Sequence, residues 1–203
     1  MKTIALVTQK GGSGKSTLAV HLAVAAARQG AVVAILDLDP QGSASLWARR
    51  RGTEDLTVVA ARAAELPGLL ADARRQRANL VLIDTAGRDD VTADAAIQFA
   101  DIVLIPCRPS LYDIGASAAT ADKIRRAGKK KAAFVLNGVP PTGNRGAEAR
   151  DALGDILPVS PVSIHTRVAY SDALNDGRSV EELDAHGKAA EEIRALYNWL
   201  IQL

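Results

Sequence analysis

A glycine-rich stretch near the N-terminus, residues 10–17, constrains the fold of this chain more than any other feature. It reads Lys-Gly-Gly-Ser-Gly-Lys-Ser-Thr and lies between an apolar, strand-like run at 3–8 and a helix-like run at 15–29. In that context, glycines let backbone N–H groups turn inward around phosphate oxygens, and the helix N-terminus adds its positive end. The stretch therefore predicts a phosphate-binding loop; a glycine turn that merely precedes a helix is the simpler alternative.

The side chains of this loop have separate expected roles in binding ATP and Mg²⁺. Lys15 would reach the β- and γ-phosphates, Ser16 would place its hydroxyl on Mg²⁺, and Thr17 would contact the α-phosphate. The residues expected to form the nucleotide site here are Gly11, Gly12, Ser13, Gly14, Lys15, Ser16 and Thr17.

Apolar strand-like runs alternate with alanine-rich helix-like runs along the whole chain. We expect strands near 3–8, 31–38, 56–60, 80–84, 101–106, 131–137 and 159–163, and helices near 15–29, 61–77, 91–100, 111–127, 145–156 and 188–202. This alternation predicts an α/β fold of three layers, with a mostly parallel twisted sheet flanked by helices. Aromatic residues make up only 3% of the chain, so Val, Leu, Ile and Ala must build the core. No linker is long enough to divide the chain, and we expect one P-loop NTPase domain over 1–203.

Carboxylates stand where two of these strands end. Asp37 and Asp39 follow the second strand in Asp-Leu-Asp-Pro-Gln, and Asp84 follows Leu-Val-Leu-Ile in the fourth. Residues i and i+2 face the same way, and the carboxyl edge of an α/β sheet is where ligands bind. Asp84 is expected to join the Mg²⁺ coordination shell. A polar strand end is the alternative explanation for Asp37 and Asp39.

The additional lysine at the start of the loop, Lys10, resembles the deviant Walker A box of the ParA/MinD superfamily, and the chain is most similar to its small ParA-type (ParF-like) partition and positioning ATPases. By that resemblance, Lys10 crosses a sandwich dimer to the other subunit's phosphates. Asp39 orients the attacking water, Asp37 supports it and the Mg²⁺ shell, and Asn137 reads the adenine edge, although it also suits a turn. Ala86, after Thr85, stands where the family more often has proline, which leaves the geometry of switch II open.

The resemblance implies an ATPase that dimerises on ATP binding, binds DNA without sequence preference and positions DNA or other cargo. It implies hydrolysis stimulated by a ParB-like or cargo-adaptor partner, a cytoplasmic, nucleoid-associated location and no membrane partner. The net charge of +2 is too small to indicate DNA binding by itself. We expect basic residues to bind phosphates, with Arg167 first, in a segment resembling the family's, followed by Arg178, Lys123, Arg125, Arg126, Lys129, Lys130 and Lys131. The cluster at 123–131 also suits a solvated helix end.

Other readings of the same motifs remain open. A MinD-like membrane ATPase requires a basic amphipathic C-terminal helix able to leave the core, whereas residues 188–202 are expected to pack as one apolar stripe. An ATP-dependent metabolic enzyme of the same ancestry usually needs a longer chain or a glutaminase domain. A single cysteine, Cys107, cannot bind an iron–sulfur cluster as paired cysteines do, and we expect it to be a small buried hydrophobe. His21 and His186 are expected to be structural, and Trp47 either packs inside or lies at a partner surface.

Overall fold

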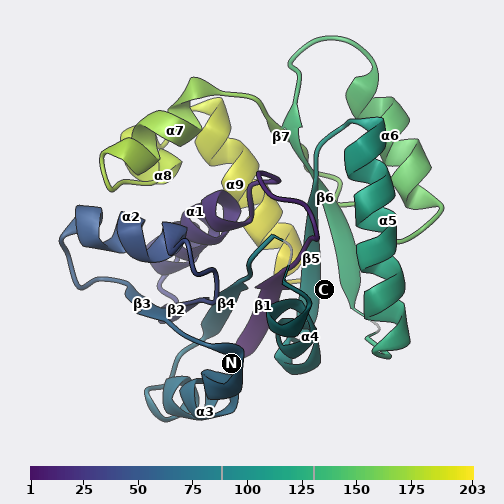
Figure 1. Cartoon of the computed structure of the whole chain (residues 1–203). Coiled ribbons are helices and arrows are strands. Elements are labelled where there is room, and N and C mark those ends of the chain that lie inside the picture. The colour runs from purple at the N-terminus through teal and green to yellow at the C-terminus, as the bar shows by residue number, and fades with distance from the viewer. Residues whose placement is uncertain (88, 130) are drawn as a thin grey trace.

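A seven-stranded sheet forms the centre of the molecule (Figure 1). The structure, a computed structural model, describes residues 1–87, 89–129 and 131–203. The strands are β1 (Lys2–Leu6), β2 (Val33–Asp37), β3 (Thr57–Ala60), β4 (Leu80–Asp84), β5 (Ile102–Cys107), β6 (Ala132–Val139) and β7 (Ile164–His165), in the order β3-β2-β4-β1-β5-β6-β7. Every described pairing is parallel, so the predicted α/β class is confirmed.

Helices cover both faces of the sheet. They are α1 (Lys15–Arg28), α2 (Ser43–Arg51), α3 (Leu66–Arg75), α4 (Asp90–Phe99), α5 (Leu111–Arg126), α6 (Arg145–Gly154), α7 (Val168–Asn175), α8 (Val180–Leu183) and α9 (Lys188–Leu200), with a 3₁₀ turn at Ala63–Glu65. Because the strands are parallel, the helix that follows each strand starts at the carboxyl edge of the sheet.

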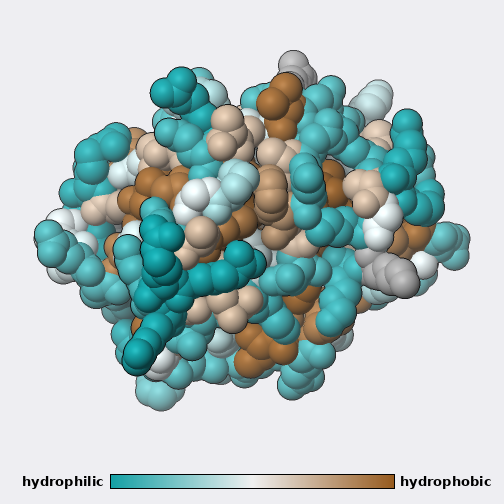
Figure 2. All heavy atoms as spheres, turned by 90° about the horizontal axis from the view of Figure 1, so that it is seen from below, coloured by the Kyte–Doolittle hydropathy of each residue, from teal (hydrophilic) through white to brown (hydrophobic). Residues whose placement is uncertain are grey.

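Two apolar clusters separate these layers. Ile4 and Leu6 of β1 belong to one cluster, with side chains of α1, α2, α7, α8 and α9. Ala5 of the same strand belongs to the other, with side chains of α3, α4, α5 and α6. The alternation of strand side chains between the two faces thus produces the predicted three layers. Seen from below, the molecular surface carries mainly hydrophilic side chains, with apolar ones in separate patches (Figure 2).

Several elements differ from the sequence prediction, among them the last strand and helix α2. The last strand was predicted at 159–163, which is wrong: β7 is Ile164–His165, and Val159 forms only an isolated bridge with Phe134. Pro158 precedes this stretch and Pro161 lies within it, and neither supplies a backbone N–H for a ladder. Helix α2 was not predicted, because its sequence is mostly polar and only Ala44 and Trp47 are buried.

The C-terminal helix packs onto the sheet as predicted. Ile193, Leu196 and Leu200 of α9 are fully buried in the cluster that includes α1. Over the residues that the structure describes, no helix combines the length and hydropathy needed to span a bilayer.

His21 gives the fold a pH-dependent stability. Its ring is fully buried, its Nδ1 accepts a hydrogen bond from the Val180 amide at 3.3 Å, and it meets the Tyr170 ring edge-on. Burial lowers the pKa of His21 from 6.5 to about 4. The unfolded chain therefore binds a proton between these values that the folded chain does not, so stability is complete above pH 6.5 and is lost toward pH 4. At about 1.36 kcal/mol per pKa unit, the loss attributable to His21 is about 3 kcal/mol.

Urea unfolding at pH 7 and pH 4.5 measures this loss. The His21→Phe protein should lose about 2–3 kcal/mol less between the two pH values than the wild type does. His186, which is exposed, supplies the control: His186→Gln should keep the wild-type pH dependence. An unchanged pH dependence in His21→Phe would show that another group is responsible.

Candidate nucleotide-binding site

The loop between β1 and α1 adopts a conformation that depends on glycine. Gly12 and Gly14 have φ of 73° and 94°, in the left-handed region that favours glycine. A Cβ on Gly14 would lie 2.1 Å from Nδ2 of Asn137. That amide nitrogen donates a hydrogen bond to the Ser13 carbonyl at 2.6 Å. Asn137 therefore braces the loop, a contact that the sequence did not predict, and its adenine contact stays a prediction.

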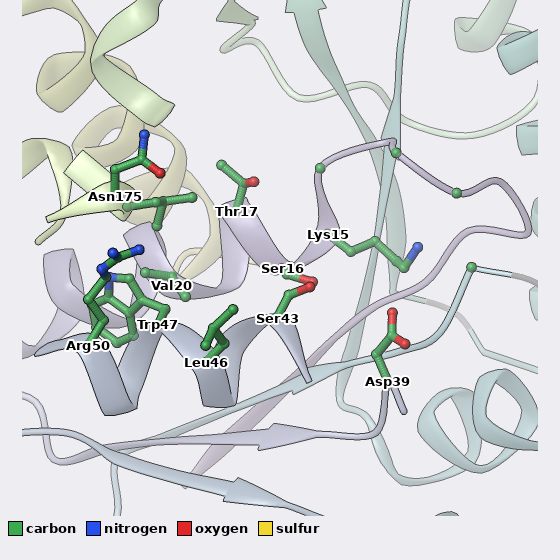
Figure 3. A pocket seen from close by; sticks show the side chains of 15 residues that line it. Lys15, Ser16, Thr17, Val20, Asp39, Ser43, Leu46, Trp47, Arg50 and Asn175 are labelled. Atoms are coloured by element: carbon green, nitrogen blue, oxygen red, sulfur yellow. The ribbon is translucent and has the colours of Figure 1, made fainter. Parts of the chain in front are cut away.

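A cavity of about 420 Å³ opens over this loop. Lys15 and Asp39 extend into the same space, and Trp47, Arg50 and Asn175 line the other end (Figure 3). Its remaining lining comes from Gly11, Gly12, Gly14, Ser16, Thr17, Val20, Ser43, Leu46, Gly87 and Leu174. This volume is within the usual range for small-molecule sites, about 300–1,000 Å³.

Lys15 and Asp84 are two buried charged groups of the site. Burial lowers the pKa of Lys15, and the charges of Asp84 and Asp39 counteract that effect. Asp84 is fully buried, and burial raises its pKa to about 7. Neither oxygen of Asp84 has a hydrogen-bond partner in the described part of the chain. A buried carboxylate in this condition fits a cation-coordinating role, because a divalent cation would satisfy both oxygens.

The described residues contain no group of three or more His, Cys, Asp or Glu side chains arranged to hold a metal ion. Mg²⁺ in nucleotide sites is usually held by one or two carboxylates together with phosphates and waters, so Asp84 and Ser16 fit that pattern.

Residues 37–42, the segment called switch I, carry two carboxylates that differ in what they contact. Asp37, which pairs with Asp84 across β2 and β4, accepts hydrogen bonds from the Asp39 amide at 3.2 Å and from the Ser45 amide and hydroxyl at 2.9 and 2.7 Å. Asp39 accepts a hydrogen bond from the Gln41 amide at 2.9 Å and faces the cavity. Asp37 thus holds the turn onto α2, while Asp39 is the carboxylate turned toward the cavity.

Residues 85–87, the switch II segment after β4, rest directly on the phosphate loop. A Cβ on Gly87 would lie 2.9 Å from Cα of Gly11, so only glycine fits there without a shift of backbone. Two residues earlier, the Thr85 hydroxyl donates to the Leu6 carbonyl at 2.8 Å. The unusual Ala86 lies between these two anchored positions.

Lys10 forms an ion pair with Asp113 at 2.9 Å. Asp113 lies in the first turn of α5 and is largely buried, and its side chain also accepts a hydrogen bond from the Ser110 hydroxyl. Burial acts to raise the pKa of Asp113, but Ser110, Lys10 and, more weakly, Arg108 lower it, with a net lowering. Sequence reasoning missed Asp113; the pattern Ser110-x-x-Asp113 marks a helix start and was the available signal.

The predicted DNA contacts are mostly engaged within the protein. Arg167 pairs with Glu192 at 2.6 Å, Lys123 with Asp90 and Asp94, Arg125 with Asp122, and Arg178 with Asp176. Lys129 donates to the carbonyls of Gln98 and Ala100, and Lys131 to that of Leu203. Arg126 is exposed and forms no ion pair with another described residue. Lys130 lies outside the described residues.

The structure does not bring these cations together on one face of the chain. Arg167 precedes α7 at the carboxyl edge of the sheet, whereas Arg125 and Arg126 end α5 at the opposite edge (Figure 1).

Three other sequence predictions have outcomes in the structure. Trp47 is packed inside: it is buried, and its Nε1 donates to the Arg178 carbonyl at 3.0 Å. Cys107 is buried, as predicted, and burial raises the pKa of its thiol. His186, expected to be structural, is exposed.

Comparison with known proteins identifies a nucleotide-binding family. The profile of the CobQ/CobB/MinD/ParA nucleotide binding domain matches residues 4–180. A relative from Halothiobacillus neapolitanus, maintenance of carboxysome distribution protein A, is 31% identical, and the match covers 98% of this chain and 96% of that protein. The protein of the same name from Gloeobacter kilaueensis is 33% identical, with 97% and 90% covered.

Solved structures share the fold at low sequence identity. MinD from Aquifex aeolicus superposes with a TM-score of 0.84 at 18% identity, covering 100% of this chain and 98% of that one. Apo McdA from Cyanothece superposes with a TM-score of 0.81, also at 18% identity, covering 98% and 99%.

Proposed function

The chain belongs to the CobQ/CobB/MinD/ParA nucleotide-binding family, and from this premise we propose that it is a ParA-type ATPase that dimerises on ATP, binds DNA without sequence preference and positions a cargo. The observation that carries the proposal is the meeting of Lys15 and Asp39 in one cavity above the phosphate loop. A phosphate-binding cation and a residue able to orient water are two of the parts that recur in sites of phosphoryl transfer.

In the proposed reaction, the loop amides and Lys15 bind the phosphates, and Asp39 orients the water that attacks the γ-phosphate. Asp84 and Ser16 would hold Mg²⁺, which would neutralise phosphate charge when bound. Asp37 keeps the switch I turn in place through Ser45. Lys10 would reach the partner's phosphates and would have to leave Asp113 to do so.

Exposed apolar side chains around the loop support the proposed dimer. Leu46, Val91, Leu111, Tyr112 and Val168 are each more than half exposed. All five lie in the first turn or two of helices that follow strands, and therefore at the same edge of the sheet as the phosphate loop. Apolar side chains gathered at one edge are typical of an interaction surface, and a second copy would bring two such edges together over the nucleotides.

Non-specific DNA binding would use cations that exchange a carboxylate for a phosphate. Exposed ion pairs contribute only about 0–1 kcal/mol, so the pairs of Arg125 and Arg178 can be exchanged readily. Arg167 is more enclosed, and Glu192 also accepts from His165 and Tyr170, so its release is harder. We therefore rank Arg126, Arg125 and Arg178 ahead of Arg167. Such a protein would be cytoplasmic and associated with nucleoid DNA.

A gel shift on random duplex DNA, with ATP, with ADP and without nucleotide, tests this function. Binding should require ATP, because dimerisation doubles the phosphate contacts. It should also weaken steeply with salt, since log K falls by about 0.9 per log unit of salt for each phosphate neutralised. Arg126→Glu and Arg178→Glu should lower both affinity and salt slope without changing basal ATP hydrolysis.

The exposed Arg74 on α3 supplies the matched control, and Arg74→Glu should bind DNA as the wild type does. Equal binding in all three nucleotide states, or binding in none, would remove DNA from the mechanism and favour a MinD-like membrane function or a metabolic enzyme.

The proposed cargo is suggested by two relatives that match over nearly their full length. These two are named for maintaining carboxysome distribution, whereas relatives matched over part of their length include a chromosome partitioning protein. We propose that a partner protein links this ATPase to a cargo, either a protein assembly or DNA, and stimulates its hydrolysis.

A further inference from the structure

Arg108 lies between the phosphate loop and the end of β6. It follows β5, which pairs with β1 on one side and β6 on the other. Its Nη2 is 3.9 Å from the position of a Cβ on Gly12, and its Cγ and Nε are 3.9 and 4.0 Å from the position of a Cβ on Gly138. The side chain thus crosses Gly138 and brings its guanidinium against the loop that gathers phosphate.

Arg108 differs in its charge balance from Lys10 and Lys15, the two lysines of the phosphate loop. Lys10 is paired with Asp113, and Lys15 lies within the influence of Asp84 and Asp39. Arg108 is exposed and forms no ion pair within 4.0 Å with any described residue. Arg108 acts on the Asp113 carboxylate only weakly and through space, so the loop has beside it a guanidinium without a close ion-pair partner among the described residues.

The guanidinium of Arg108 is a group that binds phosphate well. A guanidinium presents several N–H donors in a rigid planar fork that matches phosphate oxygens, and such charge-assisted contacts are among the strongest hydrogen bonds in proteins. The nearest expected anion is the polyphosphate of the nucleotide, held by loop amides a few ångströms away.

We propose that Arg108 is a phosphate-binding residue of the nucleotide site. This inference rests on the proposed function, since it names one more residue of the same site. The phosphate belongs either to the nucleotide in the same chain or to the one bound by a second copy facing this edge, and the two sources share the same chemistry.

Titration of the full-length protein with a fluorescent ATP analogue and Mg²⁺ tests the proposal. Arg108→Gln should weaken binding about tenfold or more, as expected for the loss of a charged contact, and Arg108→Lys should recover part of it. Arg74→Gln, on α3, is the matched control and should bind as the wild type does. Circular dichroism checks that each variant is folded.

Two protein concentrations, one below and one above dimerisation, distinguish the sources. A loss of affinity at both concentrations assigns Arg108 to the nucleotide of its own chain, and a loss only at the higher one assigns it to the partner's nucleotide. Wild-type affinity in Arg108→Gln at both concentrations would overturn the proposal for Arg108 alone. A wild type that does not bind ATP would instead overturn the proposed function.

Discussion

Replacing Lys15 with alanine is expected to abolish nucleotide binding, with a loss of at least about 100-fold in affinity. Lys15 is buried against the cavity, so its charge acts on the phosphates with little screening by water. Its removal would also take away the positive charge of Lys15 that acts on the buried Asp84. Both effects act against binding a polyphosphate.

Calorimetric titration with Mg·ATP and with Mg·ADP measures this loss. Lys188 begins α9 and is exposed, so Lys188→Ala should bind as the wild type does. If Lys15→Ala bound ATP tightly, residues 10–17 would not be the phosphate-binding loop.

Replacing Asp39 with alanine should have the opposite pattern, sparing nucleotide binding and slowing hydrolysis about 100-fold or more. The Asp39 side chain has its only described hydrogen bond with the Gln41 amide two residues later, so its removal should leave the loop and Asp84 in place. Because hydrolysis would no longer open the dimer, ATP should hold Asp39→Ala as a dimer.

Phosphate release with ATP and Mg²⁺ measures the rate of hydrolysis, and light scattering under the same conditions measures whether the protein is a dimer. Glu54→Ala, at an exposed acidic position, should behave as the wild type does. If Asp39→Ala remained monomeric with saturating ATP, the sandwich dimer would have to be abandoned, along with the proposed role of Lys10.

The parts of the site that the sequence predicted are those in which neighbouring residues determine the geometry. The phosphate loop is one continuous stretch from strand to helix, and Asp84 directly ends a buried apolar strand, so local pattern was sufficient for both. The contacts of Asp113, Ser45 and Arg108 were missed because they join segments that are separate in the sequence. Only the folded sheet brings the ends of the strands before these segments to one edge.

The surface was less predictable than the core, for a physical reason. From the sequence alone, a basic side chain such as Arg167 is expected to be free to bind a phosphate. Only the folded structure shows that Arg167 forms an ion pair with Glu192. Helix α2 was missed because only Ala44 and Trp47 are buried in it, which leaves no apolar period. The last strand was misplaced by a few residues, because prolines shifted the ladder toward Ile164.

The packing of Trp47 gives this protein an intrinsic optical reporter. The indole lines the cavity over the phosphate loop, its nitrogen donates to the Arg178 carbonyl, and the Arg51 guanidinium carbon lies 5.2 Å from the ring centroid. The other tryptophan of the chain, Trp199, lies on α9. In a Trp199→Phe background, emission would arise from Trp47 alone, so events at this wall of the cavity can be followed by fluorescence without attaching a dye.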